Sequence, residues 1–214
     1  MINVYLFGMN PITNILISYL QKDDRYSLLG VTADREYCSI TDFNGIPVIP
    51  FEDLPIDTKD FSIINCVGYA KQLMIRESVG KKIISKNIHQ LTYIHPSSII
   101  DGVKLGDGNI VMANVIVEPN AIMGDGNLLY AGCHVGHDVI IGNFNWLYTR
   151  CVVMGNVRVG NRNIIGSNSC IRSGLEVGNA SNIGIGAVVV KNVESEKNVF
   201  GNPAIEVSEI MELI

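Results

Sequence analysis

The sequence predicts two structural parts, a small parallel α/β domain over residues 1–92 and an all-β parallel β-helix over residues 93–203, followed by a C-terminal tail at 204–214. The first part alternates strand-like and helix-like segments. In the second part every sixth residue from Ile99 to Val189 is aliphatic or Met, within a longer repeat of 18 residues. A period of six inside a period of 18 is typical of a β-helix with one hexad per side and three sides per coil.

Strand and helix patterns alternate along the N-terminal part. Strands are expected at 2–8, 26–34, 45–55 (a short strand and turn) and 61–68, and helices at 12–24 and 71–88. Asn10 followed by Pro11 is typical of the N-cap and first turn of a helix. This alternation predicts a small Rossmann-like parallel sheet.

Four residues follow predicted strands of this domain, and parallel sheets bind ligands at the carboxyl ends of their strands. They are Gly8, Asn10, Asp34 and Gly68. An acidic residue after the second strand is the usual acceptor of ribose hydroxyls, which makes Asp34 a candidate. The glycine fingerprint of dinucleotide sites is absent, since Gly8 is followed by MNPITN. An NAD site is therefore disfavoured, while a nucleotide-sugar site and a purely structural domain both stay open.

A five-residue phrase marks each coil of the repeat. It reads VKLGD at 103–107, AIMGD at 121–125, VIIGN at 139–143, VRVGN at 157–161 and LEVGN at 175–179. The glycine of each phrase is followed by Asp or Asn, which predicts a corner that needs an unusual φ. A second ladder is expected to hydrogen-bond along the axis; its members are Asn109, Asn127, Asn145 and Asn163.

The outward-facing positions differ from side to side. One side is mixed and solvated: Lys104, Ile122, Ile140, Arg158 and Glu176. The other two are largely apolar: Ile110, Leu128, Trp146, Ile164 and Asn182 on one, and Ile116, His134, Val152, Cys170 and Val188 on the other. Exposed apolar stripes of this length mark interfaces, and two different faces predict a homotrimer. The alternative is that the chain's own loops cover these faces.

Composition narrows the class of protein. With net charge −5 and no basic run, a nucleic-acid partner is not expected. No apolar stretch is long enough for a membrane span, and the start lacks a signal-peptide pattern. The five cysteines form no CxxC pair, which favours buried thiols in a reducing, cytoplasmic setting.

His137 stands out in the 18-residue comparison because no other coil has a histidine there. Its equivalents are Asp101, Pro119, Gly155 and Ser173. With the neighbouring Asp138 it can form a general base, since the carboxylate fixes the imidazole tautomer; alternatively, Asp138 is an ordinary corner residue. His134 is either an interface histidine or, with His137, one of two zinc ligands. Zinc needs three protein ligands, and no third is evident, so no metal is expected.

The stretch CHVGHDVIIGNFNWLY, the preceding α/β domain and the ending VFGNPA resemble one group of enzymes. These are the left-handed β-helix (hexapeptide-repeat) sugar O- and N-acetyltransferases, which include sialic acid O-acetyltransferases and bacillosamine-type UDP-4-amino-sugar N-acetyltransferases. The V-x-H-[DE]-x-x-I-G core of the group is matched by Val135, His137, Asp138, Ile141 and Gly142.

The resemblance implies roles for particular residues. His137 would remove a proton from the sugar amine or hydroxyl, and Asp138 would raise its basicity; the acceptor would attack the thioester of acetyl-CoA directly. CoA would lie between two subunits, beside Gly155, Ser167 and Ile185. The nucleotide sugar would be held by Asn10, Pro11, Ile12, Asp34 and Arg35, and near Gly68.

Two departures from the group stand out. Its second histidine, nine residues after the base, is Trp146 here, and an indole would narrow the acyl slot or stack on the ligand. Its glycine-rich loop reads GMNPIT here.

The sequence as a whole favours a cytoplasmic, homotrimeric, acetyl-CoA-dependent N-acetyltransferase acting on a nucleotide-linked amino sugar of surface polysaccharide or glycoprotein glycan synthesis. Alternatives are a sialic acid-type sugar O-acetyltransferase and a non-catalytic trimeric module that binds a nucleotide sugar. Trp146 and the missing glycines favour the module. The sugar, the nucleotide and the acyl group stay open at this level.

Overall fold

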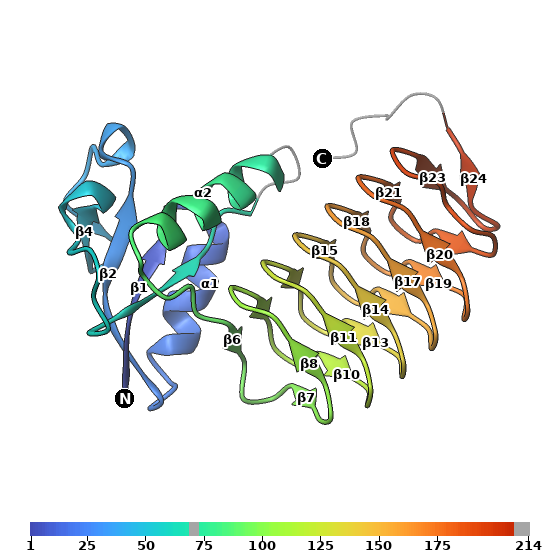
Figure 1. The fold of residues 1–214 in the computed structure, drawn as a ribbon, viewed down its shortest axis with the longest axis horizontal. Coiled ribbons are helices and arrows are strands. Elements are labelled where there is room, and N and C mark those ends of the chain that lie inside the picture. The colour runs from blue at the N-terminus through green and yellow to red at the C-terminus, as the bar shows by residue number, and fades with distance from the viewer. Residues whose placement is uncertain (69–72, 208–214) are drawn as a thin grey trace. The chain divides into compact units, whose positions relative to one another are not determined.

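The computed structural model describes residues 1–68 and 73–207 of the chain (Figure 1). Two compact units are found, one from Met1 to Tyr93 and the other beginning at Ile94. Within the described residues, no helix has the length and apolar character needed to cross a membrane.

The first unit is built on one five-stranded sheet, with the strand order β3-β4-β2-β1-β5. The central strands are parallel, because β1 pairs with β2 and β5, and β2 pairs with β4. The two-residue β3, which the sequence did not predict, pairs antiparallel with β4. The elements are β1 (Ile2–Phe7), α1 (Pro11–Leu20), β2 (Tyr26–Ala33), β3 (Asp42–Phe43), β4 (Ile46–Pro50), β5 (Ser62–Asn65) and α2 (Leu73–Ser85), with 3-10 turns at Arg35–Tyr37 and Phe51–Asp53. The predicted parallel α/β fold is confirmed.

Local chemistry starts α1 where the sequence predicts. Asn10 is the N-cap, and its side-chain oxygen accepts hydrogen bonds from the backbone N–H groups of Ile12 at 2.9 Å and Thr13 at 3.4 Å. Pro11 fills the first turn, where its missing N–H costs nothing. The helix then buries Ile12, Leu16 and other apolar residues of one face, which fixes it on the unit.

The second unit is a left-handed parallel β-helix of two-residue strands, the fold predicted for this part. Its three sides are named I, II and III here. Side I holds β8 (Lys104–Leu105), β11 (Ile122–Met123), β14 (Ile140–Ile141), β17 (Arg158–Val159) and β20 (Glu176–Val177). Side II holds β9 (Ile110–Val111), β12 (Leu128–Leu129), β15 (Trp146–Leu147), β18 (Ile164–Ile165), β21 (Asn182–Ile183) and β23 (Asn198–Phe200). Side III holds β7 (Ile99–Ile100), β10 (Ile116–Val117), β13 (His134–Val135), β16 (Val152–Val153), β19 (Cys170–Ile171) and β22 (Val188–Val189).

The ends of this unit depart from the regular coil. The strand β6 (Tyr93–Ile94) lies at the boundary between the two units, and β24 (Ile205–Glu206) pairs antiparallel with β23. Residues 205–206 of the expected tail are therefore strand, and 208–214 lie outside the described residues.

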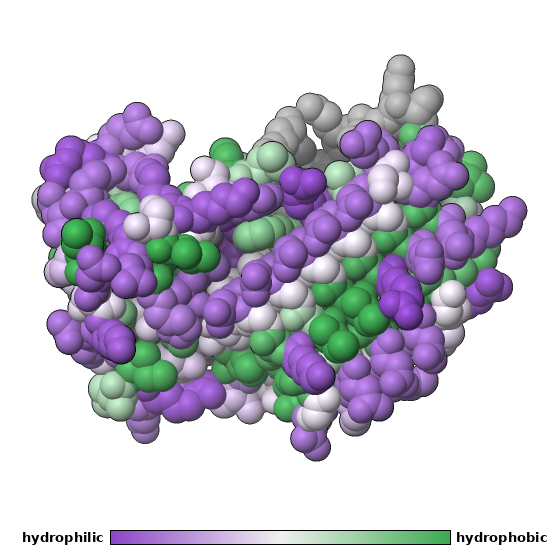
Figure 2. Space-filling view, in the orientation of Figure 1, coloured by the Kyte–Doolittle hydropathy of each residue, from purple (hydrophilic) through white to green (hydrophobic). Residues whose placement is uncertain are grey.

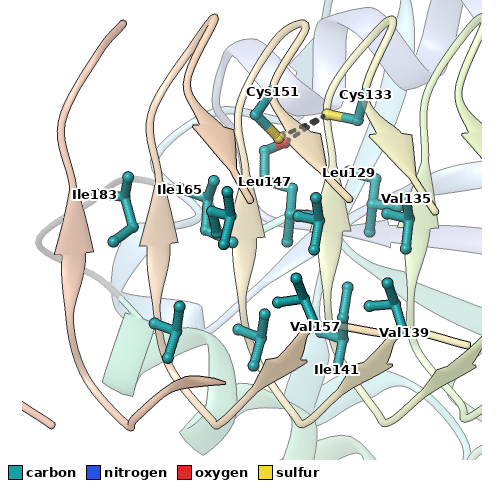
Figure 3. Packing of buried hydrophobic residues seen from close by; sticks show 14 of the residues in the cluster. Leu129, Cys133, Val135, Val139, Ile141, Leu147, Cys151, Val157, Ile165 and Ile183 are labelled. Carbon is teal, nitrogen blue, oxygen red and sulfur yellow. Dashed lines mark hydrogen bonds between the residues drawn. The ribbon is translucent and has the colours of Figure 1, made fainter. Parts of the chain in front are cut away.

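The second residue of nearly every strand points into the prism and packs on its equivalents in the coils above and below (Figure 3). Leu129, Leu147 and Ile165, for example, are fully buried in successive coils. Figure 2 shows the outer surface of these coils as parallel rows, in which residues of like hydropathy follow one another from coil to coil. The inward ladder predicted from the six-residue period is thus confirmed for these coils.

The first coil starts one residue out of the predicted phase. Ile99 pairs with the outward Ile116, and its side chain is 61% exposed, so its assignment as an inward residue is wrong. Ile100 takes the inward place and packs against the core. The next corner has one residue fewer than the regular corners, which restores the phase at Leu105.

The glycine ladder has a different cause from the one predicted. Gly106, Gly124, Gly142, Gly160 and Gly178 are not among the described residues with positive φ. They are needed because the next coil comes close: a Cβ on Gly124 would lie 2.1 Å from Asn143 Oδ1 and 3.0 Å from the Gly142 carbonyl oxygen. The Asx residues cover these glycines and accept backbone hydrogen bonds, as Asn143 does from the Asp125 N–H at 2.7 Å.

The asparagine ladder is confirmed. Asn127 Oδ1 accepts a hydrogen bond from the Asn145 N–H, and Asn145 Oδ1 accepts one from the Asn163 N–H, each at 2.8 Å. All these side chains are fully buried, so every amide must find its partner inside the stack.

Cys133 and Cys151 stack at a small-residue corner with their sulfur atoms 3.6 Å apart (Figure 3). Both are fully buried, and the hydrogen bond to Cys133 together with burial holds the pKa of Cys151 well above its usual value. Thiols in this state are unreactive, in keeping with a packing role.

The two apolar outer ladders do not share one environment. On side II, Ile110, Leu128 and Trp146 are fully buried within the single chain. The expectation that both apolar ladders lie exposed is therefore wrong for these coils of side II. On side III the outward positions stay partly exposed, and Ile116 is 38% exposed.

Candidate active site

The corner between sides III and I carries His137. Each coil turns this corner through one residue with positive φ, such as Asn120 at 66°, Asp138 at 58° and Asn156 at 62°. Asn, Asp and Gly tolerate this conformation best. The backbone thus explains a small polar residue at position 138 but makes no demand for histidine at 137.

His137 and Asp138 form the hydrogen-bonded pair predicted from the sequence. His137 Nδ1 lies 2.7 Å from Asp138 Oδ2. An ionised carboxylate only accepts hydrogen bonds, so we assign the proton of a neutral His137 to Nδ1, which leaves the Nε2 lone pair free to act as a base. The hydrogen bond from His137, supported by one from Asn120, holds the pKa of Asp138 below its usual value. The carboxylate therefore stays charged near neutral pH.

Gly155 of the next coil leaves the space that the imidazole of His137 fills. A Cβ built on Gly155 would lie 2.6 Å from His137 Nε2 and 2.8 Å from its Cε1. The His137 carbonyl oxygen also accepts a hydrogen bond from the Asn156 N–H at 2.9 Å. Gly155 therefore lies directly against the imidazole of His137, and its lack of a side chain leaves room for the ring.

Glu118 is a third member of this cluster that the sequence interpretation missed. Its Oε2 accepts a hydrogen bond from the His137 backbone N–H, and its Oε1 lies 2.8 Å from His134 Nε2. These bonds, from His134 first and then from the His137 backbone, hold the pKa of Glu118 below its usual value. The available signal was again the 18-residue comparison, because the equivalents of Glu118 carry no carboxylate: Ile100, Gly136, Met154, Arg172 and Val190.

The residues expected to contact CoA are not gathered in one place within a single chain. Ser167 and Ile185 lie in successive coils at the corner between sides II and III, where Ser167 O accepts a hydrogen bond from the Gly186 N–H. Gly155 lies at the other edge of side III, beside His137. One chain therefore presents these residues on two separate edges.

Trp146 lies on side II and is fully buried. Its ring meets Tyr148 edge-on at a centroid distance of 6.4 Å, and its indole N–H finds no acceptor among the described residues. The indole thus offers no accessible surface to a ligand in this arrangement, and its expected contact with CoA stays a prediction.

Gly8 and Asn10 come together at the carboxyl edge of the first sheet. Gly8 has a φ of 110° and donates its N–H to the Thr32 carbonyl, while Asn10 Nδ2 donates to the Cys66 carbonyl at 2.9 Å. A Cβ on Gly8 would approach Asn10 Nδ2 to 3.1 Å. The loop after β1 is thus fixed against the ends of β2 and β5, and both polar ends of the Asn10 side chain are used in doing so.

The other N-terminal candidates lie nearby in the fold but are engaged in different ways. Asp34 Oδ1 binds Lys82 Nζ at 2.6 Å. The guanidinium of Arg35 pairs with Asp53, and its backbone N–H donates to Glu52 Oε2 at 3.0 Å. Of the remaining candidates, Pro11 is exposed, whereas Ile12 and Gly68 are buried.

No three His, Cys, Asp or Glu side chains in the described parts of the chain gather closely enough to hold a metal ion. His134 and His137, the two ligands considered from the sequence, are each bonded to a carboxylate of their own.

A known protein family matches the part of the β-helix that begins at the corner of His137 and Asp138. The model of the bacterial transferase hexapeptide family (six repeats) matches residues 138–173. The chain carries a bacterial transferase hexapeptide repeat. The matched repeat begins at Asp138, within the corner that carries His137, and it confirms the hexad pattern predicted from the sequence.

Several solved structures share the fold over nearly the whole length of the hexapeptide-repeat chain. The acetyltransferase domain of PglB from Neisseria gonorrhoeae FA1090 is similar with a TM-score of 0.86 and 23% identity, covering 96% of this chain and 99% of that one. A histidine-to-asparagine mutant of perosamine N-acetyltransferase from Caulobacter crescentus, in complex with CoA and GDP-perosamine, gives 0.85 and 22%, with 97% of each chain covered.

WeeI from Acinetobacter baumannii AYE gives a TM-score of 0.84 and 20% identity, covering 97% of this chain and all of that one. By sequence, no curated protein matches the chain. At these identities the likeness confirms the two-part fold.

Proposed function

We propose that this protein is an acetyl-CoA-dependent N-acetyltransferase that acylates the amine of a nucleotide-linked amino sugar. The observation that carries the proposal is the His137–Asp138 pair, at a corner where the repeat requires no histidine. The likeness to the PglB domain and to perosamine N-acetyltransferase, the latter in complex with CoA and GDP-perosamine, supports the choice of an amine acceptor and a nucleotide sugar.

His137 would act as the general base. With Nδ1–H held by Asp138, Nε2 takes a proton from the sugar nitrogen as that nitrogen attacks the thioester carbonyl carbon. The C–N bond forms, the C–S bond breaks, and the leaving thiolate of CoA takes the proton that the imidazole of His137 received from the amine. Asp138 stabilises the imidazolium that forms, because it stays ionised beside the ring. No acyl-enzyme is needed in this scheme.

We infer a homotrimer in which the site is completed between subunits. The His137 side chain is 57% exposed in the single chain, so a lone subunit does not shield the reaction from water. Ser167 and Ile185 lie on the other edge of side III from the base, and a neighbouring subunit would bring its own copies of them to His137. CoA would then lie in the groove between two subunits.

The N-terminal unit would hold the nucleotide sugar at the carboxyl edge of its sheet. Gly8, Asn10 and Asp34 follow β1 and β2, which run parallel and therefore end at the same edge. Asn10 and Asp34 already have partners within the chain. The nucleotide sugar would therefore bind backbone groups of the loop after β1, and it would replace Lys82 as the partner of Asp34. The cell compartment expected for this reaction is the cytoplasm, where acetyl-CoA and nucleotide sugars are made.

The test is a panel of UDP-, dTDP- and GDP-linked amino sugars incubated with acetyl-CoA, with release of free thiol as the readout. Acyl transfer to at least one of them is expected, and hydroxylamine treatment separates an amide product, which resists it, from an ester product. An ester would favour the O-acetyltransferase instead. Binding of a nucleotide sugar with no thiol release, and no thermal shift with acetyl-CoA, would favour the non-catalytic module.

His137→Ala is expected to lower kcat by about 100-fold or more, the usual scale for loss of a general base, with the fold intact because the side chain is exposed. His95→Ala removes an imidazole from the same unit, at an exposed position where it bonds Ser97, and it should keep full activity. Unchanged turnover by the His137 variant would remove this residue from the mechanism.

A further inference from the structure

Two residues beside His137 depart from the repeat as plainly as His137 does. No other coil has an imidazole at the position of His134, whose equivalents are Ile116, Val152, Cys170 and Val188. At the position of Glu118 the first coil has Asp101 in the register of the paired strands, and the later coils have no carboxylate: Gly136, Met154, Arg172 and Val190. Because the coils of β16 and β19 form the same corner without these side chains, the fold does not require them. Their joint occurrence next to the base points to a role in the reaction.

Glu118 connects these residues across two coils. Its Oε2 accepts the backbone N–H of His137, and its Oε1 lies 2.8 Å from Nε2 of His134. By the same reasoning as for Asp138, the proton between Glu118 and His134 belongs to His134 Nε2 while the imidazole is neutral. One carboxylate thus binds the main chain of the base and one neighbouring imidazole at once.

Few contacts besides those of Asp138, Glu118 and Gly155 hold His137 in position. Its ring is more than half exposed, and it lies at a turn, where backbone motion is least restrained. Asp138 fixes the tautomer of the ring, whereas Glu118 fixes the peptide N–H from which the ring extends. A glutamate side chain alone has three rotatable bonds, and the bond to His134 holds it in the one rotamer that reaches this N–H.

We propose that Glu118 is a positioning residue for His137, and that His134 is the side chain that holds Glu118 in place. The role is specific to proton transfer and so rests on the proposed function. Glu118 bonds the backbone N–H of His137 and the imidazole of His134, so it would act on the reaction through His137.

The kinetic test compares Glu118→Ala with Glu118→Gln. The alanine variant is expected to lose about 10- to 100-fold in kcat, the range for a misplaced catalytic group, with KM for both substrates within about threefold of wild type. The glutamine variant should recover most of this loss, because its amide oxygen can still accept the His137 N–H. Glu176→Ala, which removes an exposed carboxylate from side I, is the matched control and should be unchanged.

His134→Leu tests the second half of the proposal while keeping the apolar character of side III. It should lower kcat by less than Glu118→Ala does, and the double variant should be no slower than Glu118→Ala alone. This non-additivity is expected when one residue acts through another. Two independent losses that multiply would overturn the assigned role of His134.

A measurement without substrate separates this proposal from the proposed function. The His137 backbone amide, followed by NMR hydrogen exchange, should exchange at least about tenfold faster in Glu118→Ala than in wild type or Glu176→Ala. If no nucleotide sugar is acetylated by the wild type, the proposed function fails, and this exchange rate still decides whether Glu118 holds the corner. An unchanged exchange rate, or a lowered Tm with unchanged kcat, would overturn the positioning role.

Discussion

Asp138 meets two requirements at a single position. Its φ of 58° is demanded by the corner and is satisfied in other coils by asparagine or glycine. Its carboxylate holds Nδ1–H of His137, which a neutral amide would do more weakly. The neighbouring coils show that the first requirement is general, so only the second distinguishes this coil. A turn residue has thus been given a chemical role without a change in the path of the chain.

Gly155 allows a sharp test of the same site. In Gly155→Ala the new Cβ would meet the imidazole of His137 at 2.6 Å, and the exposed ring is expected to swing aside. The φ of Gly155 is not positive, so alanine brings no backbone strain. We expect kcat to fall about 100-fold, as for a catalytic group moved by about 1 Å. Stability should change by less than about 1 kcal/mol, since a flexible, exposed side chain absorbs the clash.

Steady-state kinetics and thermal unfolding of the same sample check this. Ser173→Ala, one coil farther on at the equivalent exposed position, is the control and should match wild type in both. A strongly destabilised Gly155→Ala protein would show that the glycine serves coil packing instead of the base.

At the scale of the elements, the coils are held together by polar ladders as well as by the apolar core. Asn145 donates from Nδ2 to the Gly160 carbonyl at 2.9 Å, and its Oδ1 accepts both the backbone N–H and the side-chain amide of Asn163. All of these groups are shielded from water. The ladder therefore satisfies corner backbone groups that no strand pairing reaches.

We expect Asn145→Ala to lower the free energy of unfolding by about 2–4 kcal/mol, because it leaves the Asn163 N–H and the Gly160 carbonyl oxygen without their partner in a buried site. Asn179→Ala removes an acceptor of the Asn161 N–H in the exposed ladder, where water replaces it, and should cost less than about 1 kcal/mol. Chemical denaturation of both variants gives the comparison. Equal costs would show that burial does not govern the ladder.

The sides and coils were predictable from the sequence because one inward residue per hexad is a local, repeated demand. The phase of the first coil of the β-helix was not predictable, since Ile99 and Ile100 are both apolar. Only the short corner after them places Ile100 on the inside. The glycine ladder was found for the wrong reason, because the approach of Gly124 to Asn143 is a property of two stacked coils. Likewise Glu118 reaches His134 and His137 only once the coils are stacked.

For the whole molecule, the surface that forms the proposed trimer is side III. Its outward ladder stays partly exposed and contains no full charge apart from His134 when protonated, whereas the apolar ladder of side II is buried in its first coils. Side I carries Lys104, Arg158 and Glu176 and suits water. A ring of three needs two different contact surfaces on each subunit. In the proposed assembly the edge of side III that carries His137 meets the edge that carries Ser167 and Ile185 of a neighbouring subunit.

Ile116→Glu is therefore expected to dissociate the trimer, because it places a charge within the apolar contact. Ile122→Glu is the matched control: Ile116 and Ile122 are 38% and 42% exposed, but the second lies on side I and should leave the assembly intact. Sedimentation velocity measures the mass, and kcat should fall with dissociation if the site is shared. A wild-type protein that sediments as a monomer would contradict the assembly and the shared site together.

The division into two kinds of fold was visible in the sequence because helix, strand and hexad patterns have different periods. The His137–Asp138 pair was also predictable, since one coil compared with the others isolates His137. The burial of Trp146 was not predictable from the sequence. Whether an outward position is exposed or buried depends on contacts beyond its own coil, and the hexad pattern does not contain this information.

The stacked corners place equivalent residues at regular intervals along the axis of the β-helix. Equivalent positions recur every 18 residues, and neighbouring coils are separated by about 4.8 Å, the spacing of paired strands. A histidine at this corner needs room in the next coil, as Gly155 leaves for His137, and its height along the prism can change only in steps of this size. If His137 is the base that we propose, the coil that carries it sets how far along the prism a ligand must extend to reach it.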